Sequence, residues 1–241
     1  MKLLPAFHTI SLVLLILTQQ SAAQHTITIQ HTYYTSYFDT ILKVPIVAEY
    51  TQTREHRLML ALPGAIDRST VASFTQDSLL PTKYQVATNT TYHDWNQAHP
   101  DTPYDKGHMV PFQAMAFNRV AAKETNKLNT NTNYQASYNN EHQWYRVEHI
   151  VLDSLCSKYG DIDVLTLCLF STSHPKWANS VRVPDYYVKV ALYMANGTKS
   201  GRAWIEPNVK SLDTSPASIE DTPANIKRII LQYYPNLQLN F

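Results

Sequence analysis

The chain has 241 residues, of which 44% are hydrophobic and 16% are charged. This composition excludes a disordered chain and is sufficient for one sizeable core. The formal net charge is +1, so there is no global positive field, and a polyanionic partner would have to meet a local basic patch.

The first residues have the layout of a cleaved secretory signal. Lys2 precedes an apolar run at 10–17, and small residues follow at 21–23. The run is shorter than the roughly 20 apolar residues that a membrane-spanning helix needs. We therefore predict a signal peptide at 1–23 and a single secreted, extracellular domain at 24–241 that does not associate with a membrane. Removing the signal takes away one lysine and no acidic residue, which leaves a formal net charge of zero.

The first half of the domain has several strand signals. Alternation and β-branched residues predict strands at 27–31, 43–50 and 58–62, the last one ended by Pro63-Gly64. Residues 78–106 are polar and interrupted by prolines, so we expect mostly loop there.

The second half begins with a helix signal. Apolar residues recur at helical spacing after Asn140, and Tyr159-Gly160-Asp161 supplies the stop. These apolar residues are Trp144, Val147, Val151 and Leu155. Residues 164–170 form a predicted buried strand.

The remaining elements are a hairpin and a final helix. Segments 186–194 and 203–205 flank Asn196-Gly197, a strong hairpin signal. Thr222-Pro223 opens a helix with one apolar stripe, which we expect to pack in the core. The stripe consists of Ile226, Ile229, Ile230 and Tyr233. This mixed order predicts an α+β fold with a largely antiparallel sheet.

The two cysteines of the chain are Cys156 and Cys168. The first falls near the end of the predicted helix and the second lies several residues into the next strand. At about 3.3 Å per strand residue, they are farther apart than the roughly 7 Å Cα limit of a disulfide. We expect two buried, unbridged cysteines. Asn89-Thr90-Thr91 and Asn196-Gly197-Thr198 are glycosylation sequons, consistent with a secreted glycoprotein.

The stretch Tyr104-Asp-Lys-Gly-His108 is the first candidate for chemistry. Taken alone, His108 is an ordinary loop histidine or a general base held in place by the backbone freedom of Gly107. The sequence downstream helps to decide between these interpretations.

Two polar residues downstream of this stretch have side chains that can bind a single hard cation. Asn140 lies at the start of the predicted helix, where its amide faces outward or caps the helix. Glu148 lies about 12 Å further along, so one of the two would bind a cation while the other holds a metal-bound water. Mg²⁺ keeps several waters and accepts few protein oxygens. Together with a histidine base opposite, this arrangement is a one-metal phosphodiesterase design.

At this point the sequence resembles a known family. Tyr-Asp-Lys-Gly-His is similar to the Asp-Arg-Gly-His signature of the DNA/RNA non-specific endonucleases, the ββα-metal or His-Me finger nucleases, which include endonuclease G-like and secreted arthropod double-stranded ribonucleases. A second block matches at the family's spacing, and looser similarity covers about 34–237. The residues of this block are Asn131, Gln135, Asn140, Trp144 and Glu148.

The resemblance implies a ββα-metal fold whose mainly antiparallel sheet is flanked by helices, and it implies cleavage of DNA and RNA without sugar specificity. His108 matches the general base and Asn140 the ligand of one Mg²⁺, for which Mn²⁺ is the alternative. Glu148 matches the acid that holds metal-bound water. Lys106 would help to hold the phosphate, and we group it with His108, Glu148 and Asn131 as catalytic candidates. Asp105 and Asn131 match positions that shape the site.

The chain departs from the family in three places. Lys106 replaces an arginine, which exchanges a planar, bidentate phosphate clamp for a point charge. Ser171-Thr-Ser-His-Pro175 stands after the strand of Cys168, where the family has Thr-Gly-Pro. Arg68 is the candidate for a second family arginine, although its spacing differs.

Two other functions stay open. The Lys106 substitution favours a secreted nucleic-acid-binding protein that uses this scaffold with weak or lost catalysis. A zinc hydrolase would use His142 and His149 with Glu141 and Glu148, but the histidines are seven residues apart, which is two helical turns rather than one.

Two further groups have ordinary structural explanations. Tyrosines 33, 34 and 37 could stack on bases, but tyrosine-rich strand faces usually pack inside a protein. Lys227-Arg228 is expected to be a solvated helix face.

Overall fold

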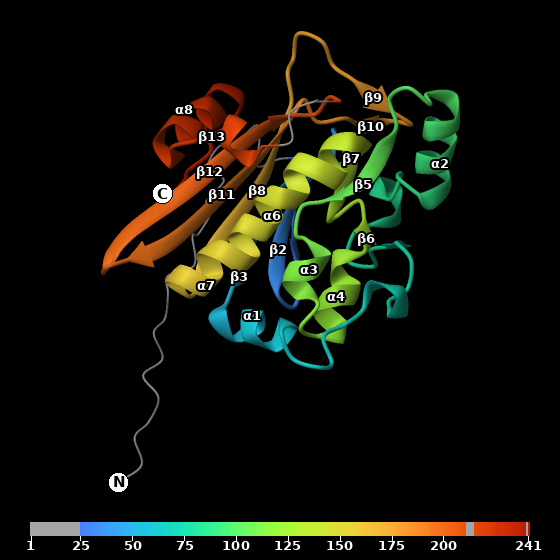
Figure 1. The fold of residues 1–241 in the computed structure, drawn as a ribbon. Helices are drawn as coiled ribbons and strands as arrows, with labels where there is room; N and C mark the ends of the chain where they lie inside the picture. The colour runs from blue at the N-terminus through green and yellow to red at the C-terminus, as the bar shows by residue number, and fades with distance from the viewer. Residues whose placement is uncertain (1–24, 211–214, 240) are drawn as a thin grey trace.

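The computed structural model describes residues 25–210, 215–239 and 241. The predicted signal peptide, 1–23, lies outside these residues. The centre of the described part is a seven-stranded sheet in the order β1-β2-β3-β8-β11-β12-β13, with antiparallel neighbours throughout (Figure 1). The strands are β1 (Thr26–Gln30), β2 (Tyr34–Asp39), β3 (Val44–Gln52), β8 (Ile162–Leu169), β11 (Tyr186–Ala195), β12 (Thr198–Pro207) and β13 (Glu220–Asp221). The α+β prediction with a mainly antiparallel sheet is confirmed.

A long helix crosses one face of this sheet (Figure 1). It runs from Ser137 to Tyr159 and ends at Gly160, whose φ of 88° only glycine adopts easily. Its segments are α5 (Ser137–Asn139), α6 (Tyr145–His149) and α7 (Cys156–Tyr159), which two π-helical stretches connect, Asn140–Trp144 and Ile150–Leu155. The predicted apolar positions of this helix are all buried against the sheet.

The alternation of strand residues explains why both faces of the sheet are covered. On β11, Tyr187 packs with the long helix, whereas Val188 packs with α8 (Pro223–Tyr233). Within α8, Ile226 and Ile230 are fully buried, which confirms the predicted stripe. Successive side chains point to opposite faces, so one strand supplies two cores.

A separate pair of strands carries the Tyr104–His108 motif. β5 (Tyr104–His108) pairs antiparallel with β7 (Thr132–Ala136), which leads directly into the long helix, so the order is strand, strand, helix. Gly107 is required for close packing, and not for the backbone freedom that the sequence suggested. A Cβ at Gly107 would lie 2.2 Å from Gln135 Oε1, so the glycine allows close approach of the two strands rather than an unusual backbone angle.

Two of the predicted elements are wrong. The segment 58–62 is not a strand, because most of it belongs to α1 (Arg54–Leu60), whose first turn is capped by Thr53 accepting from His56 N at 3.0 Å. The segment 78–106 is not mostly loop, since α2 (Asn89–Ala98) begins there with a capping box between Thr88 and Thr91. In both places a capping side chain stabilises a helix, although the residues that follow it suggested a strand or a loop.

Short elements complete the described part. They are β4 (Thr75–Gln76), β6 (Lys127–Leu128), β9 (Trp177–Ala178), β10 (Val181–Arg182), α3 (Phe112–Met115) and α4 (Arg119–Thr125), with 3-10 turns at 68–70, 82–84 and 216–218. No helix in the described ranges has the length and apolar character that crossing a membrane requires.

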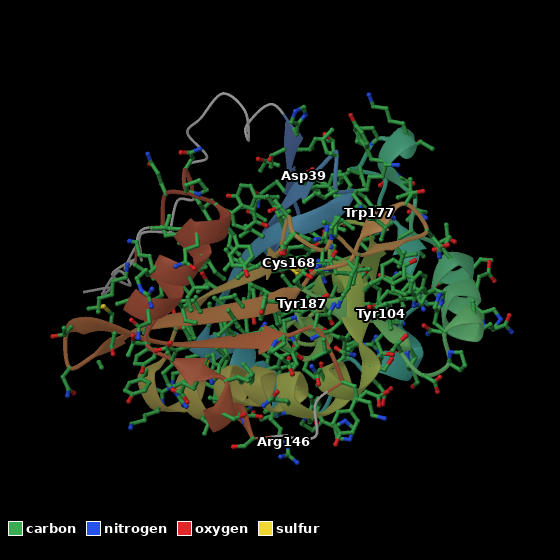
Figure 2. The ribbon with its side chains drawn as sticks, turned by 90° about the horizontal axis from the view of Figure 1, so that it is seen from above. Asp39, Tyr104, Arg146, Cys168, Trp177 and Tyr187 are labelled. Carbon is green, nitrogen blue, oxygen red and sulfur yellow. The ribbon has the colours of Figure 1, made fainter. Side chains whose placement is uncertain are left out.

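Several smaller predictions can be compared with the structure. Both cysteines are free and buried, as expected, and Cys168 lies beside Tyr187 in the middle of the sheet (Figure 2). Tyr34 and Tyr37 are buried, which supports packing rather than base stacking. Lys227 is not simply solvated, because its ammonium donates to the carbonyl oxygens of Leu239 and Phe241.

The sheet face under the long helix contains buried charge. The fully buried Lys189 donates from Nζ to Thr166 Oγ1 at 3.0 Å and lies 3.9 Å from Glu148 Oε1. Its ammonium also sits 5.0 Å from the centre of the Trp144 ring. Glu206, on the neighbouring strand, is 1% exposed, and neither of its carboxylate oxygens has a hydrogen-bond partner among the described residues. Burial, reinforced by the charge of Glu148, raises the pKa of Glu206 to about 8.

This pKa predicts how stability depends on pH. Since the pKa of Glu206 is 4.5 when it is not perturbed, the folded protein keeps a proton between about pH 4.5 and 8 that the unfolded chain has released. Stability should therefore fall as the pH rises through this window, by up to about 1.4 kcal/mol per pH unit from this group. Glu206→Gln should match the wild type near the acidic end and be more stable at the alkaline end.

Urea unfolding of both proteins at about pH 5 and about pH 8.5 measures this effect. Glu55→Gln, on an exposed position of α1, is the matched control and should differ from the wild type by the same amount at both pH values. An equal difference at both pH values for Glu206→Gln would contradict a raised pKa.

Candidate active site

An open cleft of about 690 Å³ lies where β5, the start of the long helix and α2 meet. Five of the six predicted site residues line it, from segments that are far apart in sequence. These five are Asp105, Lys106, His108, Asn140 and Glu148. Arg68, the candidate second arginine, lines the same cleft. The two sequence blocks therefore converge on one site.

His108 is held as a neutral imidazole at the last position of β5. Burial, with a smaller contribution from the positive charge of Arg68, lowers the pKa of His108 from 6.5 to about 3. Its ring packs against Phe74 with centroids 5.2 Å apart. A neutral ring has one nitrogen with a free lone pair, which is what a general base needs.

Asn126 determines which nitrogen that is. The amide of Asn126 donates from Nδ2 to the carbonyl oxygen of Ala72 at 3.0 Å, so its Oδ1 is the atom that faces His108 Nε2, at 3.4 Å. An amide oxygen only accepts, so Nε2 carries the proton and Nδ1 keeps the lone pair. Asn126 cannot be singled out from the sequence, because it is one of several asparagines in a polar stretch and has no distinguishing pattern.

Asn140 is oriented by Asp105. Its Nδ2 donates to Asp105 Oδ2 at 2.8 Å, and the other oxygen of Asp105 accepts from Ser137 Oγ at 2.8 Å. The amide oxygen of Asn140 is thereby turned away from Asp105 and left for another partner. The idea that Asn140 caps the helix is wrong, because the helix begins at Ser137 and Asn140 has helical angles (φ −56°, ψ −45°).

Glu148 lies on the next turns of the same helix, with its side chain 16% exposed toward the cleft. Burial raises the pKa of Glu148, and the nearby charge of Lys189 opposes that rise. Lys189 therefore favours the ionised carboxylate at this position, from behind the cleft.

The cations of the cleft share an aromatic wall. Lys106 Nζ lies 5.2 Å from the ring centre of Phe74 and 5.3 Å from that of Tyr92, and burial lowers the pKa of Lys106. The Arg68 guanidinium lies 5.0 Å from the Phe112 ring and 5.6 Å from that of Phe74. Although its spacing in the sequence is unusual, Arg68 reaches the same space as Lys106.

Asn131 is the predicted site residue that does not line the cleft. It is fully buried and uses its amide to join two loops. It accepts from Val110 N at 2.9 Å and donates to the carbonyl oxygens of Val110 at 3.0 Å and Thr125 at 2.8 Å. These loops adjoin His108 and Asn126, so Asn131 holds these two residues in place and does not itself line the cleft.

The donors in the cleft fit a hard cation. Among residues 25–210, 215–239 and 241 there is no group of three or more His, Cys, Asp and Glu side chains that could hold a metal ion. His142 and His149 instead bond through Nδ1 to Tyr138 O and to Asp153, each at 2.8 Å. What the cleft does offer is the amide oxygen of Asn140 and the carboxylate of Glu148, which are ligands that Mg²⁺ prefers.

Comparison with known proteins identifies the fold and the family of this chain. A solved structure of EndoG, from its complex with EndoGI, superimposes with a TM-score of 0.69, with 24% identity over 83% of this chain and 82% of the other. Curated proteins gave no significant match. The sequence model of the DNA/RNA non-specific endonucleases matches residues 16–226. Since that match covers most of the sequence, the chain belongs to the DNA/RNA non-specific endonuclease family.

Proposed function

We propose that this protein is a secreted, Mg²⁺-dependent endonuclease that hydrolyses phosphodiester bonds of DNA and RNA, with His108 as its general base. The observation that carries the proposal is the neutral imidazole of His108 in one cleft with the oxygen donors Asn140 and Glu148. The base and the oxygen donors come from different elements, so a phosphate can lie between them.

The chain's own residues account for the proton transfer. His108 Nδ1 takes a proton from a water molecule while the water oxygen bonds to phosphorus, and the bond to the 3′ oxygen breaks. Nε2–H stays bonded to Asn126, which keeps the ring oriented. The bound phosphate is an anion beside Arg68, and its charge raises the pKa of His108 again, which strengthens the base when substrate is present.

Asn140 would hold the cation directly, and Glu148 would hold one of its waters. When bound there, Mg²⁺ or Mn²⁺ supplies Lewis-acid stabilisation of the charge on the phosphate and on the leaving oxygen. Asp105 keeps the amide oxygen of Asn140 directed away from itself, and the charge of Lys189 opposes the rise that burial causes in the pKa of Glu148.

The substrate range follows from what the cleft recognises. Lys106 and Arg68 are cations that bind phosphate, and phosphate contacts carry no sequence information. The motif residues that line the cleft address only the phosphodiester, so we propose cleavage of both DNA and RNA.

Secretion is supported by residues 1–23 and by a sequon in a suitable place. Asn196 is exposed at the tip of the β11–β12 hairpin, where a glycan meets no obstacle from the sheet. Asn89 is exposed as well, but it lines the active-site cleft and donates to the carbonyl oxygen of Phe74. We therefore propose Asn196 as the glycosylated position.

The second candidate function is nucleic-acid binding on the same scaffold with weak or lost catalysis, and the lysine at 106 favours it. Incubating purified protein with plasmid and Mg²⁺, with and without EDTA, separates the candidates. Cleavage that EDTA abolishes supports the nuclease, whereas binding without cleavage supports the second candidate.

His108→Ala should abolish cleavage and leave the fold and nucleic-acid affinity largely unchanged. Loss of a general base costs about 10² to 10⁴ in rate. Single-turnover rates and circular dichroism provide the measurement, and His93→Ala, at another position lining the cleft, is the control. Near wild-type turnover of a folded His108→Ala protein would refute the assignment.

Asn140→Ala should shift the Mg²⁺ dependence of activity to higher concentrations, and Glu148→Ala should shift it less. The first change removes a direct ligand, and the second removes a contact through water. Titration of cleavage against Mg²⁺ measures both. If neither curve moves, the metal binds elsewhere.

Lys106→Arg should raise the cleavage rate, because a guanidinium donates hydrogen bonds to two phosphate oxygens at once. It would also stack on the rings of Phe74 and Tyr92, which Lys106 contacts. Affinity should change little, since it is spread over many phosphates. Single-turnover cleavage of one defined duplex at fixed salt is the measurement. A slower variant would show that the site is adapted to lysine.

A further inference from the structure

A second cleft, of about 550 Å³, adjoins the active-site cleft. Tyr104 and Glu141 line both clefts, so the two spaces share a wall. The second cleft is formed by segments 100–104, 136–138 and 208–210 together with Lys176. Its volume is within the range of ligand-binding pockets, about 300 to 1,000 Å³.

The floor of the second cleft is held by Asn208, which is buried and has its whole amide engaged. Its Oδ1 accepts from Ala136 N at 2.7 Å, and its Nδ2 donates to the carbonyl oxygens of Tyr134 at 2.8 Å and Pro184 at 2.9 Å. These bonds join the end of β7, the end of β12 and the loop before β11. The floor is therefore a fixed surface rather than a gap between loops.

Two lysines, Lys176 and Lys210, are among the residues that line this cleft. The carbonyl oxygen of Lys176 accepts from Val183 N at 2.9 Å and from the Arg182 guanidinium at 3.0 Å. Lys210 comes shortly after Asn208 in the chain. The backbone N–H of Asn208 donates to the carbonyl oxygen of Asp185 at 2.8 Å. Both lysines thus extend from backbone that is anchored to segment 183–185, and both are exposed. The acidic residues of the lining, Asp101 and Glu141, come from other segments.

The second cleft is connected to the metal-binding side of the active site. Ser137 lines the second cleft, and its hydroxyl donates to Asp105, which in turn accepts from Asn140. A ligand seated beside Ser137 would lie next to the residues that orient the proposed metal ligand.

We propose that the second cleft binds the part of the nucleic-acid strand that adjoins the cleaved phosphodiester, with Lys176 and Lys210 holding its phosphates. This inference rests on the proposed function. A polymeric substrate extends beyond the bond that is cut, and the shared wall at Tyr104 and Glu141 gives it a continuous path. Because the net charge of the chain is small, local lysines have to supply the attraction for phosphate.

Aromatic side chains along this path suit the bases. Trp177, beside Lys176 on β9, is 46% exposed, which is unusual for a tryptophan. Tyr104 and Trp177 lie on the same side of the molecule when it is seen from above (Figure 2). Tyr138, which is partly exposed, lines the cleft. Stacking on such rings is tolerant of sequence, as a non-specific nuclease requires.

The test compares a small substrate with a long one. Bis(p-nitrophenyl) phosphate fills only the active-site cleft, whereas a labelled single-stranded oligonucleotide can fill both. Lys176→Ala/Lys210→Ala should raise KM for the oligonucleotide about tenfold and leave kcat/KM for the small diester unchanged. In EDTA, the anisotropy of the labelled strand should show affinity about tenfold weaker, with a log–log salt slope shallower by about 1.4.

Lys123→Ala/Lys158→Ala removes the same charge from exposed positions on α4 and α7, away from β9 (Figure 1), and should behave as the wild type does. Oligonucleotide affinity like that of the wild type in the Lys176/Lys210 variant would overturn the inference. So would an equal loss on both substrates, which would place the lysines at the catalytic step. If the wild type cleaves neither substrate, the proposed nuclease activity fails, while the affinity measurement in EDTA still decides this inference.

Discussion

The close pairing of β5 with β7 is the constraint on which the site depends. Gly107 lies against Gln135 with no room for a Cβ, and this contact fixes the register that pairs His108 with Thr132. Since β7 runs straight into the long helix, the same register fixes where Asn140 stands relative to Asp105. A substitution at Gly107 would separate the strands and thereby move His108 away from Asn140 and Glu148.

Burial then determines the protonation state of each group. His108 is kept neutral because desolvation and Arg68 both disfavour its charged form. Burial raises the pKa of Glu148 to about 7, and the charge of Lys189 beside it limits this rise. Glu206 has no such partner, and burial raises its pKa to about 8. The pKa values of His108, Glu148 and Glu206 are thus shifted to different extents because their neighbours differ. His108 and Glu148 line the cleft, whereas Glu206 does not.

The sequence was most informative where residue spacing itself carries the information. The two motif blocks, the long helix and the stripe of α8 were predictable because fixed intervals place residues on one face. It was least informative where a cap or a distant contact decides the outcome. Thr53 turns a strand-like segment into α1, Asn131 works from behind the cleft through backbone contacts, and Asn126 orients His108 from a stretch with no pattern. Arg68 could not be aligned by spacing, but the fold brings it to the cleft.

The position of Arg68 also explains how a lysine can stand at 106. Family members have an arginine there. A lysine offers one point charge in place of a planar guanidinium that can donate two hydrogen bonds. Here Arg68 contacts the Phe74 ring that Lys106 also contacts, so a guanidinium is still present on the same wall of the cleft. The aromatic rings stabilise both cations while burial lowers the pKa of Lys106, which makes its proton easier to share with a phosphate oxygen. The cleft therefore keeps one planar and one compact cation on the same aromatic wall, so under the proposed function both cations, and not position 106 alone, would hold the phosphate.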